Sequence, residues 1–333
     1  MSHGFEHMAT RSVLPERYSL ENLQKVVRNP RLLQKELFTL GLRINSRAAQ
    51  FRNERRGTDD GVDVMDADWD NLLILDGCRH DMFAVQSDLE GTLSRKRSRG
   101  SDSWEFMEAN FAGKDLHDTV YVTANPHVYE LEGDVFHAVV DLLDRCWDED
   151  ARTVRPDAVV EEAIAARDRF PDKRLIVHFM QPHFPFLGPT GEQFSHKGLE
   201  HHLDDDERSS APNPWFGLIH DQDIDIETVV AAYRENLDIV LPHVESLLEA
   251  LDGKSVVTAD HGNLIGERGV PVPIRLYGHP RGLHVDQLLT VPWLEVDGAT
   301  RREIVSEPPV AADDATDADD DAVEDRLSAL GYV

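Results

Sequence analysis

The sequence predicts an α/β fold with a mostly parallel central sheet and helices on both faces. Short apolar runs alternate with longer segments of helical period, which is the pattern of repeated strand–helix–strand units. The chain has 333 residues, 41% of them hydrophobic, which is enough to enclose one large core. No apolar run approaches the roughly 18 residues that span a membrane. We therefore expect a soluble globular protein.

Five short apolar runs predict the strands. The first, 70–76 (DNLLILD), ends in an acidic residue, and the others are 120–123, 175–180, 255–258 and 291–296. Between the strands, apolar residues at helical spacing predict helices at 102–111, 135–147, 158–169 and 226–251. The segment 188–225 is rich in Pro, His and Asp, and its length predicts an insertion that forms a lid or rim.

These elements divide the chain into four parts. A catalytic domain at 66–305 follows a basic amphipathic arm at 1–65. The segment 306–322 combines Asp and Ala without an apolar period, which predicts a disordered acidic linker. The last residues, 323–333, contain leucines at helical spacing and predict a short helix that docks on the body.

The charge of the chain excludes nucleic acid as a partner. The formal net charge is −29, from 34 basic and 63 acidic residues, and it repels phosphate backbones. The acid is spread evenly and Lys is scarce, which resembles the salt-adapted surface of haloarchaeal proteins. The two cysteines, Cys78 and Cys146, exclude a disulfide framework. No apolar stretch follows the polar residues 1–10, so we expect no signal peptide and a cytoplasmic location.

The N-terminal arm has the opposite charge. From Arg11 to Arg56 there are eleven basic and four acidic residues, a local charge of +7. Apolar residues at helical spacing on both sides of Pro30 predict two amphipathic helices. Two alternatives follow. The arm packs on the acidic body of its own chain, or it contacts an acidic partner or the inner face of the membrane as a peripheral anchor.

Two acidic residues and a histidine follow directly after predicted strands. Asp76 ends the first strand, and Asp260 and His261 follow strand 255–258. The carboxyl ends of parallel strands meet at one edge of a sheet. Two carboxylates and one imidazole at that edge predict a site for a divalent metal ion. The alternative is that Asp-His-Gly forms only a turn.

A serine-rich segment lies between the first strand and the next helix. In Ser98–Phe106 (SRGSDSWEF), Gly100 permits close backbone approach, and Ser101 lies near a helix start. Amide N–H groups and the helix dipole favour an anion at such a start. Ser101 is thus placed to attack a phosphate or sulfate ester. The alternative is that Ser101 only caps the helix, with Glu105 nearby.

Other polar residues flank these segments. His183, between prolines beyond strand 175–180, is predicted to contact substrate, whereas His178 alternates inward and is predicted to be a core histidine. Arg79 follows Asp76 closely and is predicted to bind an anionic oxygen, and Cys78 to pack as a small side chain. Three histidines of the insertion, surrounded by many Asp residues, predict a solvated rim rather than a zinc site: His196, His201 and His202.

In family order, the motifs resemble the alkaline phosphatase/sulfatase superfamily, and within it the sulfatase-like and lipoteichoic-acid-synthase-like members. The matching segments are LILDGCRHD, GSDSWEFM, VHFMQPHFPF, VVTADHGNLIGERG, YGHP followed by LLTVPWLEV, and RLSALGYV. They extend from Asp70 to the C-terminus. The resemblance implies an alkaline-phosphatase-like fold and a metal-dependent hydrolase or transferase of phosphate-type esters, including glycan- or lipid-linked ones.

The resemblance also implies roles for single residues. These are metal ligation by Asp76, Asp260 and His261, nucleophilic attack by Ser101, and contact with the transferred group or leaving oxygen by His183 and His279. In an alternative register the nucleophile is Ser103, which otherwise binds substrate together with Arg79.

Two departures from the family narrow these expectations. The chain lacks the Cys-x-Pro-x-Arg motif of formylglycine sulfatases, and Gln181 stands where relatives have Asp. The second change favours one divalent ion (Mn, Ca, Mg or Zn) over two; a second ion would be bound by His279. Two alternatives stay open: a sulfate-ester hydrolase without formylglycine, and an inactive glycan- or partner-binding protein of the same fold.

Overall fold

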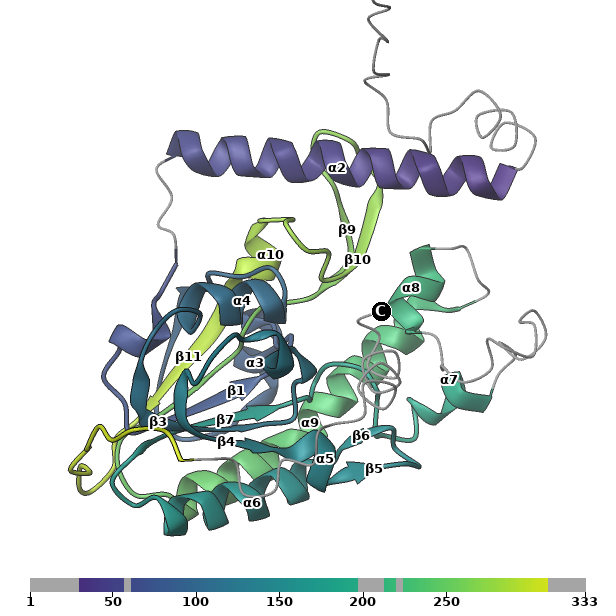
Figure 1. Ribbon diagram of the computed structural model, residues 1–333. Coiled ribbons are helices and arrows are strands. Elements are labelled where there is room, and N and C mark those ends of the chain that lie inside the picture. Colours follow the sequence, from purple (N-terminus) through teal and green to yellow (C-terminus); the bar gives the residue numbers. More distant parts are fainter. Residues whose placement is uncertain (1–29, 57–60, 197–212, 220–223, 311–333) are drawn as a thin grey trace, which may run out of the picture.

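A seven-stranded sheet forms the centre of the molecule in the computed structural model (Figure 1). The structure describes residues 30–56, 61–196, 213–219 and 224–310. The strand order is β2-β11-β8-β1-β7-β3-β4. The bounds are β1 Asn71–Leu75, β2 Thr92–Arg97, β3 Leu116–Thr123, β4 Phe136–Asp141, β7 Arg174–Phe179, β8 Ser255–Thr258 and β11 Thr290–Val296. Only β11 runs antiparallel to its neighbours β8 and β2. The predicted mostly parallel sheet is confirmed.

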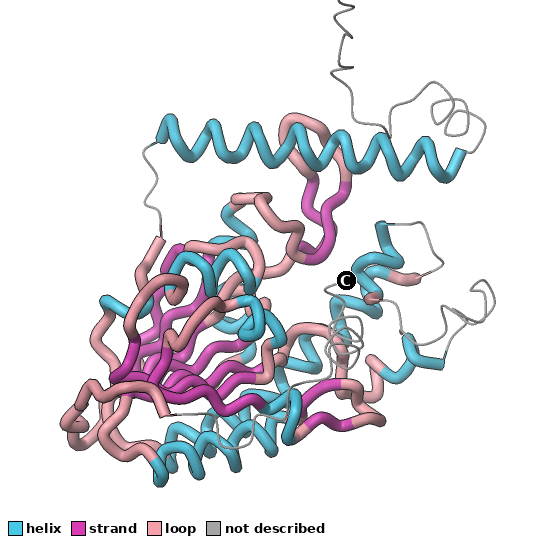
Figure 2. Tube along the Cα trace, in the orientation of Figure 1, coloured by secondary structure: helices cyan, strands magenta, loops and turns pink. Residues whose placement is uncertain are grey.

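Helices cover both faces of this sheet. They are α3 His80–Gln86, α4 Ser103–Asn110, α5 Leu142–Arg145, α6 Pro156–Arg169, α9 Ile226–Ala250 and α10 Asp286–Leu289, with short 3-10 turns η2 Val64–Asp66 and η3 Pro126–Glu130. Helices α6 and α9 lie on one face and α4 on the other, so that the strands form a middle layer (Figure 2). The helices predicted at 102–111, 158–169 and 226–251 are confirmed as α4, α6 and α9.

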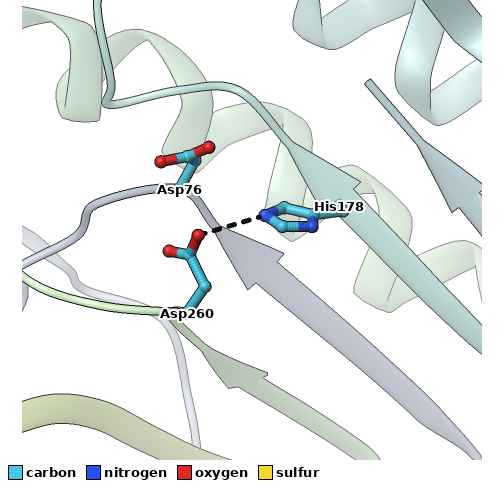
Figure 3. A group of neighbouring side chains, drawn as sticks. All are labelled: Asp76, His178 and Asp260. Carbon is cyan, nitrogen blue, oxygen red and sulfur yellow. Dashed lines mark ion pairs between the residues drawn. The ribbon is translucent and has the colours of Figure 1, made fainter. Parts of the chain in front are cut away.

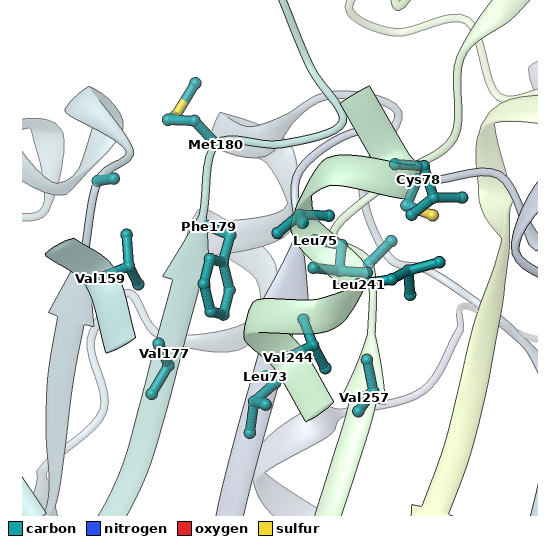
Figure 4. Packing of buried hydrophobic residues seen from close by; sticks show 14 of the residues in the cluster. Leu73, Leu75, Cys78, Val159, Val177, Phe179, Met180, Leu241, Val244 and Val257 are labelled. Atoms are coloured by element: carbon teal, nitrogen blue, oxygen red, sulfur yellow. The ribbon is translucent and has the colours of Figure 1, made fainter. Parts of the chain in front are cut away.

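Strand residues alternate between two cores. Leu73, Val177 and Val257 point toward α9, where they pack with Leu241 and Val244 (Figure 4). Each such buried side chain stabilises the fold by about 1.5–3 kcal/mol. The intervening residues, Leu72, Ile74, Ile176 and Val256, belong to the core on the side of α4. Even-numbered residues of β1, β7 and β8 therefore face α4.

The helix predicted at 135–147 is wrong. Phe136–Asp141 forms β4, which pairs in parallel with β3 at the sheet edge, and the short α5 and strand β5 (Trp147–Asp148) follow. β5 pairs with β6 (Thr153–Val154). The β-branched residues within β4 fit a pleated surface, and pairing with β3 overrides the helical spacing. The sequence reading also missed β2 and the hairpin of β9 (Leu264–Arg268) and β10 (Arg275–Gly278).

The described part of the basic arm is one helix, α2 (Pro30–Arg56). It lies across the β9–β10 hairpin, away from the central sheet (Figure 1). The helix predicted before Pro30 lies outside the described residues. In the predicted insertion, α7 (Glu192–His196) and α8 (Pro214–Ile219) are helical. His201 and His202 also lie outside the described residues.

The first residues of the predicted acidic linker, 306–310, contact the body of the protein. Residues 305–310 run along the sheet edge, with backbone N–H groups of Val305, Glu307 and Val310 donating to carbonyls of the body. Glu307 also accepts a hydrogen bond of 2.7 Å from Lys173 Nζ. The first residues of the predicted disordered segment 306–322 are thus held in place. The remainder of that segment and the predicted docking helix at 323–333 lie outside the described residues.

Candidate active site

Three buried side chains converge at the carboxyl ends of β1, β7 and β8. Asp76, His178 and Asp260 each offer one donor atom, and these atoms all lie within 4.8 Å of one another (Figure 3). All three side chains are fully buried. They meet because each continues the even-numbered alternation that faces α4. Two carboxylates buried together repel each other unless a cation or a proton lies between them. The group is a candidate metal centre.

His261 completes the predicted trio. Its Nε2 lies 3.6 Å from Asp76 Oδ1 and 3.5 Å from Asp260 Oδ2. Two donors bound to one ion at about 2.1 Å are at most about 4.2 Å apart, so these distances fit a shared ion. Nδ1 lies 2.7 Å from the Gly262 carbonyl, which assigns the ring proton to Nδ1 and a lone pair to Nε2. Burial disfavours the imidazolium, but the two carboxylates outweigh it and raise the pKa of His261.

Asp260 supplies the clearest sign of a ligand. Its Oδ1 accepts hydrogen bonds from the N–H groups of Gly77 (2.9 Å) and His261 (2.8 Å). Its buried Oδ2 makes no hydrogen bond within the described part of the chain. Burial favours the neutral acid, but His261, His178 and the Gly77 N–H lower the pKa of Asp260. Gly77, at φ +64°, turns the chain so that its N–H reaches this carboxylate. A buried charged oxygen that lies 3.5 Å and 3.7 Å from two imidazole nitrogens fits a borderline divalent ion.

His178 is buried as predicted, but it is more than a core residue. Its Nε2 lies 3.7 Å from Asp260 Oδ2, and its Nδ1 lies 2.8 Å from the hydroxyl of Tyr121. Burial lowers the pKa of His178 to about 4, so the ring is neutral, which is the form that binds metal. A proton on Nδ1, shared with Tyr121, leaves Nε2 for an ion. Neither His178 nor Tyr121 was predicted from the sequence to take part in a metal site.

Asn125 holds the first carboxylate and was also missed. Its Nδ2 donates to Asp76 Oδ2 at 2.8 Å, and its Oδ1 accepts from the N–H of His127 at the start of η3. Whereas Asp76 directly follows β1, Asn125 lies two residues beyond the end of β3. Its position after a strand was a usable signal, but no motif marked it.

The structure places Ser103, rather than Ser101, at the candidate metal centre. Ser103 is the first residue of α4, and its Oγ lies 3.3 Å from His261 Nε2 and 3.4 Å from Asp76 Oδ2. The N-cap of the helix is Asp102, which accepts from the N–H of Glu105 at 2.8 Å. The helix therefore begins at Ser103, one residue later than the predicted start at 102, and its N-cap is Asp102 rather than Ser101. The geometry corresponds to the alternative register.

Ser101 belongs to a different group, here called the Ser101 cluster: Ser101, Glu105, Gly282 and His284. Ser101 Oγ donates to Glu105 Oε2 at 2.7 Å and accepts from the N–H of Gly282 at 3.0 Å. His284 Nε2 lies 3.0 Å from the same Glu105 oxygen. Burial opposes ionisation of Glu105, but its hydrogen bonds from His284 and Ser101 lower its pKa to about 2. The cluster joins the start of α4 to the loop after β10.

The two other predicted histidines lie side by side. His183 Nε2 is 2.9 Å from His279 Nε2, and the His279 ring lies 4.5 Å from the His261 ring, centroid to centroid. His183 Nδ1 bonds the Phe184 carbonyl, so its Nε2 accepts and His279 Nε2–H donates. Burial lowers the pKa of His183 to about 4 and that of His279 well below its usual value. Asn236 of α9 positions this loop through a 2.8 Å bond to the His183 carbonyl.

The structure contradicts the predicted role of Arg79 as a ligand of an anionic substrate oxygen. Its Nε and Nη2 bond Asp81 at 2.8 and 2.7 Å, and its Nη1 bonds Glu267 at 2.6 Å and the Asn263 carbonyl at 2.8 Å. A guanidinium held by two carboxylates is not available to a substrate anion. Cys78 is fully buried in the α9-side core, as predicted. The Gln181 amide donates to the Val154 carbonyl at 3.1 Å.

No family model and no curated protein matches the chain. Similar solved structures include lipooligosaccharide phosphoethanolamine transferase A from Neisseria meningitidis, an integral membrane protein, at 13% identity and a TM-score of 0.44. The alignment covers 67% of this chain and 47% of that one, so the chain spans about half its length. The periplasmic domain of EcEptC from Escherichia coli, in complex with Zn, has 13% identity, a TM-score of 0.45 and coverage of 72% and 76%.

A third similar structure is the phosphonate monoester hydrolase SpPMH from Silicibacter pomeroyi, at 14% identity, a TM-score of 0.41 and coverage of 78% of this chain and 72% of that one. These similarities are likenesses of fold. A fold hosts many reactions, and only the side chains of the site define its chemistry.

Proposed function

We propose that the protein is a metal-dependent hydrolase or transferase of phosphate-type esters, with Ser103 as its nucleophile. The observation that carries the proposal is the position of Ser103 Oγ at the N-terminus of α4, 3.3 Å from His261 and 3.4 Å from Asp76. The residues that would hold one Mn, Ca, Mg or Zn ion are Asp76, His178, Asp260 and His261. A bound divalent ion neutralises an anionic ester and lowers the pKa of a hydroxyl beside it.

The chain's own groups supply the remaining chemistry. The N–H groups at the start of α4 orient and stabilise the oxygens of the transferred group. Ser103 Oγ bonds to phosphorus while the bond from phosphorus to the leaving oxygen breaks, and the Ser103 proton passes to the Asp76 carboxylate. The leaving oxygen takes its proton from water, while the paired rings of His183 and His279 contact the transferred group. Water or an acceptor alcohol then attacks phosphorus and releases Ser103.

The substrate class that we propose is a small-molecule, glycan- or lipid-linked anionic ester, as the motif resemblance implies. Arg79 is not included among its ligands, because Asp81 and Glu267 occupy it. The single ion, the salt-adapted surface and the cytoplasmic location remain predictions from the sequence.

Parallel assays of an aryl phosphate and an aryl sulfate, with each divalent ion, test the proposal. We expect Ser103→Ala to lower kcat on the order of 10³-fold or more. The kcat of the matched variant Ser101→Ala should stay within about tenfold of the wild-type value. Ser101 bonds to Glu105 rather than to a residue of the candidate metal centre. Full activity of Ser103→Ala would show that Ser103 is not the nucleophile. Turnover of the aryl sulfate but not of the aryl phosphate would identify a sulfatase. Absence of turnover of both with every ion would favour the alternative of a binding protein.

A second measurement identifies the bond that forms. After rapid acid quenching during turnover of the aryl phosphate, mass spectrometry should find one phosphoryl group on the peptide that contains Ser103. Fragmentation distinguishes Ser103 from Ser101. Phosphorylation of Ser101, or of neither serine under conditions of turnover, contradicts the assignment.

A further inference from the structure

We propose that the outer face of α2 docks the protein on an anionic lipid surface. Helix α2 has two apolar sides, and the inner one is occupied. Asn45 makes two hydrogen bonds to the hairpin loop. Its Nδ2 donates to the Val272 carbonyl at 2.9 Å, and its Oδ1 accepts from the Val272 N–H at 2.8 Å. Phe38 and Leu42 pack on the small core of the hairpin region. These contacts fix which side of α2 faces the protein.

The opposite side carries large apolar residues exposed to solvent. This outer stripe consists of Leu33 (38% exposed), Leu37 (58%), Leu40 (52%), Ile44 (40%) and Phe51 (53%). The residues are separated by steps of three, four or seven, so they form one line along the helix. At 100° per residue the line lies on the far side from Phe38, Leu42 and Asn45. A continuous exposed apolar stripe marks an interaction surface.

The charge beside the outer stripe selects an anionic surface. Helix α2 contains seven basic and two acidic residues, a local charge of +5 in a chain of net charge −29. Arg47 lies within the stripe, between Ile44 and Phe51, and the Arg55 guanidinium lies 4.5 Å from the Phe51 ring. Such side chains keep their stems on apolar surface and extend their charges to phosphate groups. Leu and Phe flanked by Arg form the pattern of a helix that lies in a membrane interface.

A second copy of the chain fits the outer stripe less well. Pairing stripe against stripe would bury Arg47 among apolar side chains and bring two helices of charge +5 together. An anionic lipid surface satisfies both the apolar residues and the arginines. Among the described helices none is long and apolar enough to cross a membrane, so the contact proposed is a peripheral one.

The position of α2 relates this surface to the candidate site. The helix rests on the β9–β10 hairpin, and β10 ends at Gly278, directly before His279. Docking of α2 would bring that edge of the site toward the lipid headgroups. In this respect the inference rests on the proposed function and narrows its substrate to a lipid-linked ester. Membrane binding itself does not depend on catalysis, so the two can fail separately.

Flotation of the full chain with vesicles tests the docking surface. We expect binding to phosphatidylglycerol–phosphatidylcholine vesicles and at least tenfold weaker binding to phosphatidylcholine alone. Leu37→Glu/Leu40→Glu should weaken binding to anionic vesicles at least tenfold. The matched control Val85→Glu changes an apolar residue on α3 that is 85% exposed, and it should bind like the wild type. Circular dichroism and turnover of a water-soluble aryl phosphate verify that each variant is folded and that any loss is confined to docking.

The charge contribution is tested in the same assay. Arg47→Gln should weaken binding severalfold, whereas Arg95→Gln on the exposed strand β2 should not. The Arg47 effect should shrink from 0.15 M to 1 M salt, because the screening length falls from about 8 Å to about 3 Å. Equal binding to both lipid compositions, or full binding by the Leu37→Glu/Leu40→Glu variant, would overturn the inference. A dimer in light scattering that this variant dissociates, without vesicle binding, would assign the stripe to a second copy.

Discussion

Ser101 and Ser103 lie at the same end of α4, yet they belong to groups with different hydrogen bonding. Ser101 Oγ donates to Glu105 and accepts from Gly282, and the Glu105 oxygen also bonds His284. Ser103 instead faces the candidate metal centre, where Asp260 Oδ2 and His178 Nε2 make no hydrogen bond within the described residues. Both groups are polar and largely buried. They differ in whether the protein supplies hydrogen-bond partners for the buried polar atoms of the group.

This difference distinguishes a group that the protein itself satisfies from a candidate metal centre. Buried polar atoms in folded proteins almost always have partners, because an unsatisfied group costs about 1–3 kcal/mol. The Ser101 cluster follows that rule and connects two segments of chain. The metal centre departs from it at atoms that converge on one point, as expected where a ligand supplies the missing partner.

The largest expected effect is at Asp260. We expect Asp260→Asn to abolish tight binding of a divalent ion, measured by elemental analysis after dialysis, because it removes the charged oxygen between the imidazoles. An ion at 100 times its dissociation constant raises the free energy of unfolding of the wild type by about 2.7 kcal/mol. That increase should be absent in the variant.

The same variant carries an internal control. In chelator, Asp260→Asn should be less stable than the wild type, because the ionised carboxylate of Asp260 is stabilised in the folded chain by His261, His178 and the Gly77 N–H. A variant that still gains stability from the ion would contradict the metal-centre assignment.

A smaller effect is expected at the residues that hold the ligands. Asn125→Ala and Tyr121→Phe remove hydrogen bonds to Asp76 and His178 without removing a ligand. Such changes lower metal affinity about 10–100-fold. Titration of the stripped protein with zinc measures the change, and Glu105→Gln serves as the control that leaves affinity unchanged. Equal affinity of all three variants would mean that Asn125 and Tyr121 do not orient the centre.

A change within the Ser101 cluster should affect stability and little else. Glu105→Gln weakens the bonds to Ser101 and His284, for which we expect a loss of about 1–3 kcal/mol in the free energy of unfolding. Urea denaturation measures this loss. A fall in metal affinity that matches the loss of stability would show that the two groups are coupled rather than separate.

The smallest effect is a pH dependence of the same cluster. The folded pKa of Glu105, about 2, lies below its ordinary value of 4.5. The carboxylate therefore contributes stability that is complete above pH 4.5 and is lost as the pH falls toward 2. The stability difference between wild type and Glu105→Gln should shrink between pH 5 and pH 3. A difference that stays constant over this range would show that Glu105 is not the titrating group.

Much of the sheet was predictable because its central strands are apolar on both faces. Asn71–Leu75 and Ser255–Thr258 appear as short apolar runs bounded by polar residues. β4 was misassigned because Phe136–Asp141 mixes polar and apolar residues and becomes a strand only by pairing with β3. β2 was missed because it is exposed and polar, and only its pairing with β11 defines it.

The site was predictable where residues follow strands in a recognisable motif. Asp76, Asp260 and His261 met this condition and do lie together. His178 did not, because its role depends on register: it pairs with Ile74 on one side and Thr123 on the other, which the sequence alone does not give. The choice between Ser101 and Ser103 depended on where α4 begins, and Asp102 sets that boundary.

The turn at Gly77 links the site to the opposite side of the sheet. Its N–H bonds Asp260, and its carbonyl accepts from the hydroxyl of Tyr233 on α9. The Tyr233 ring in turn meets Trp215 edge to face, with centroids 5.7 Å apart. We expect a shift of the Asp260 carboxylate to reach this buried indole through these contacts. The intrinsic fluorescence of Trp215 should therefore change when an ion occupies the candidate metal centre, without any added dye. The Trp215→Phe variant gives the background signal to subtract.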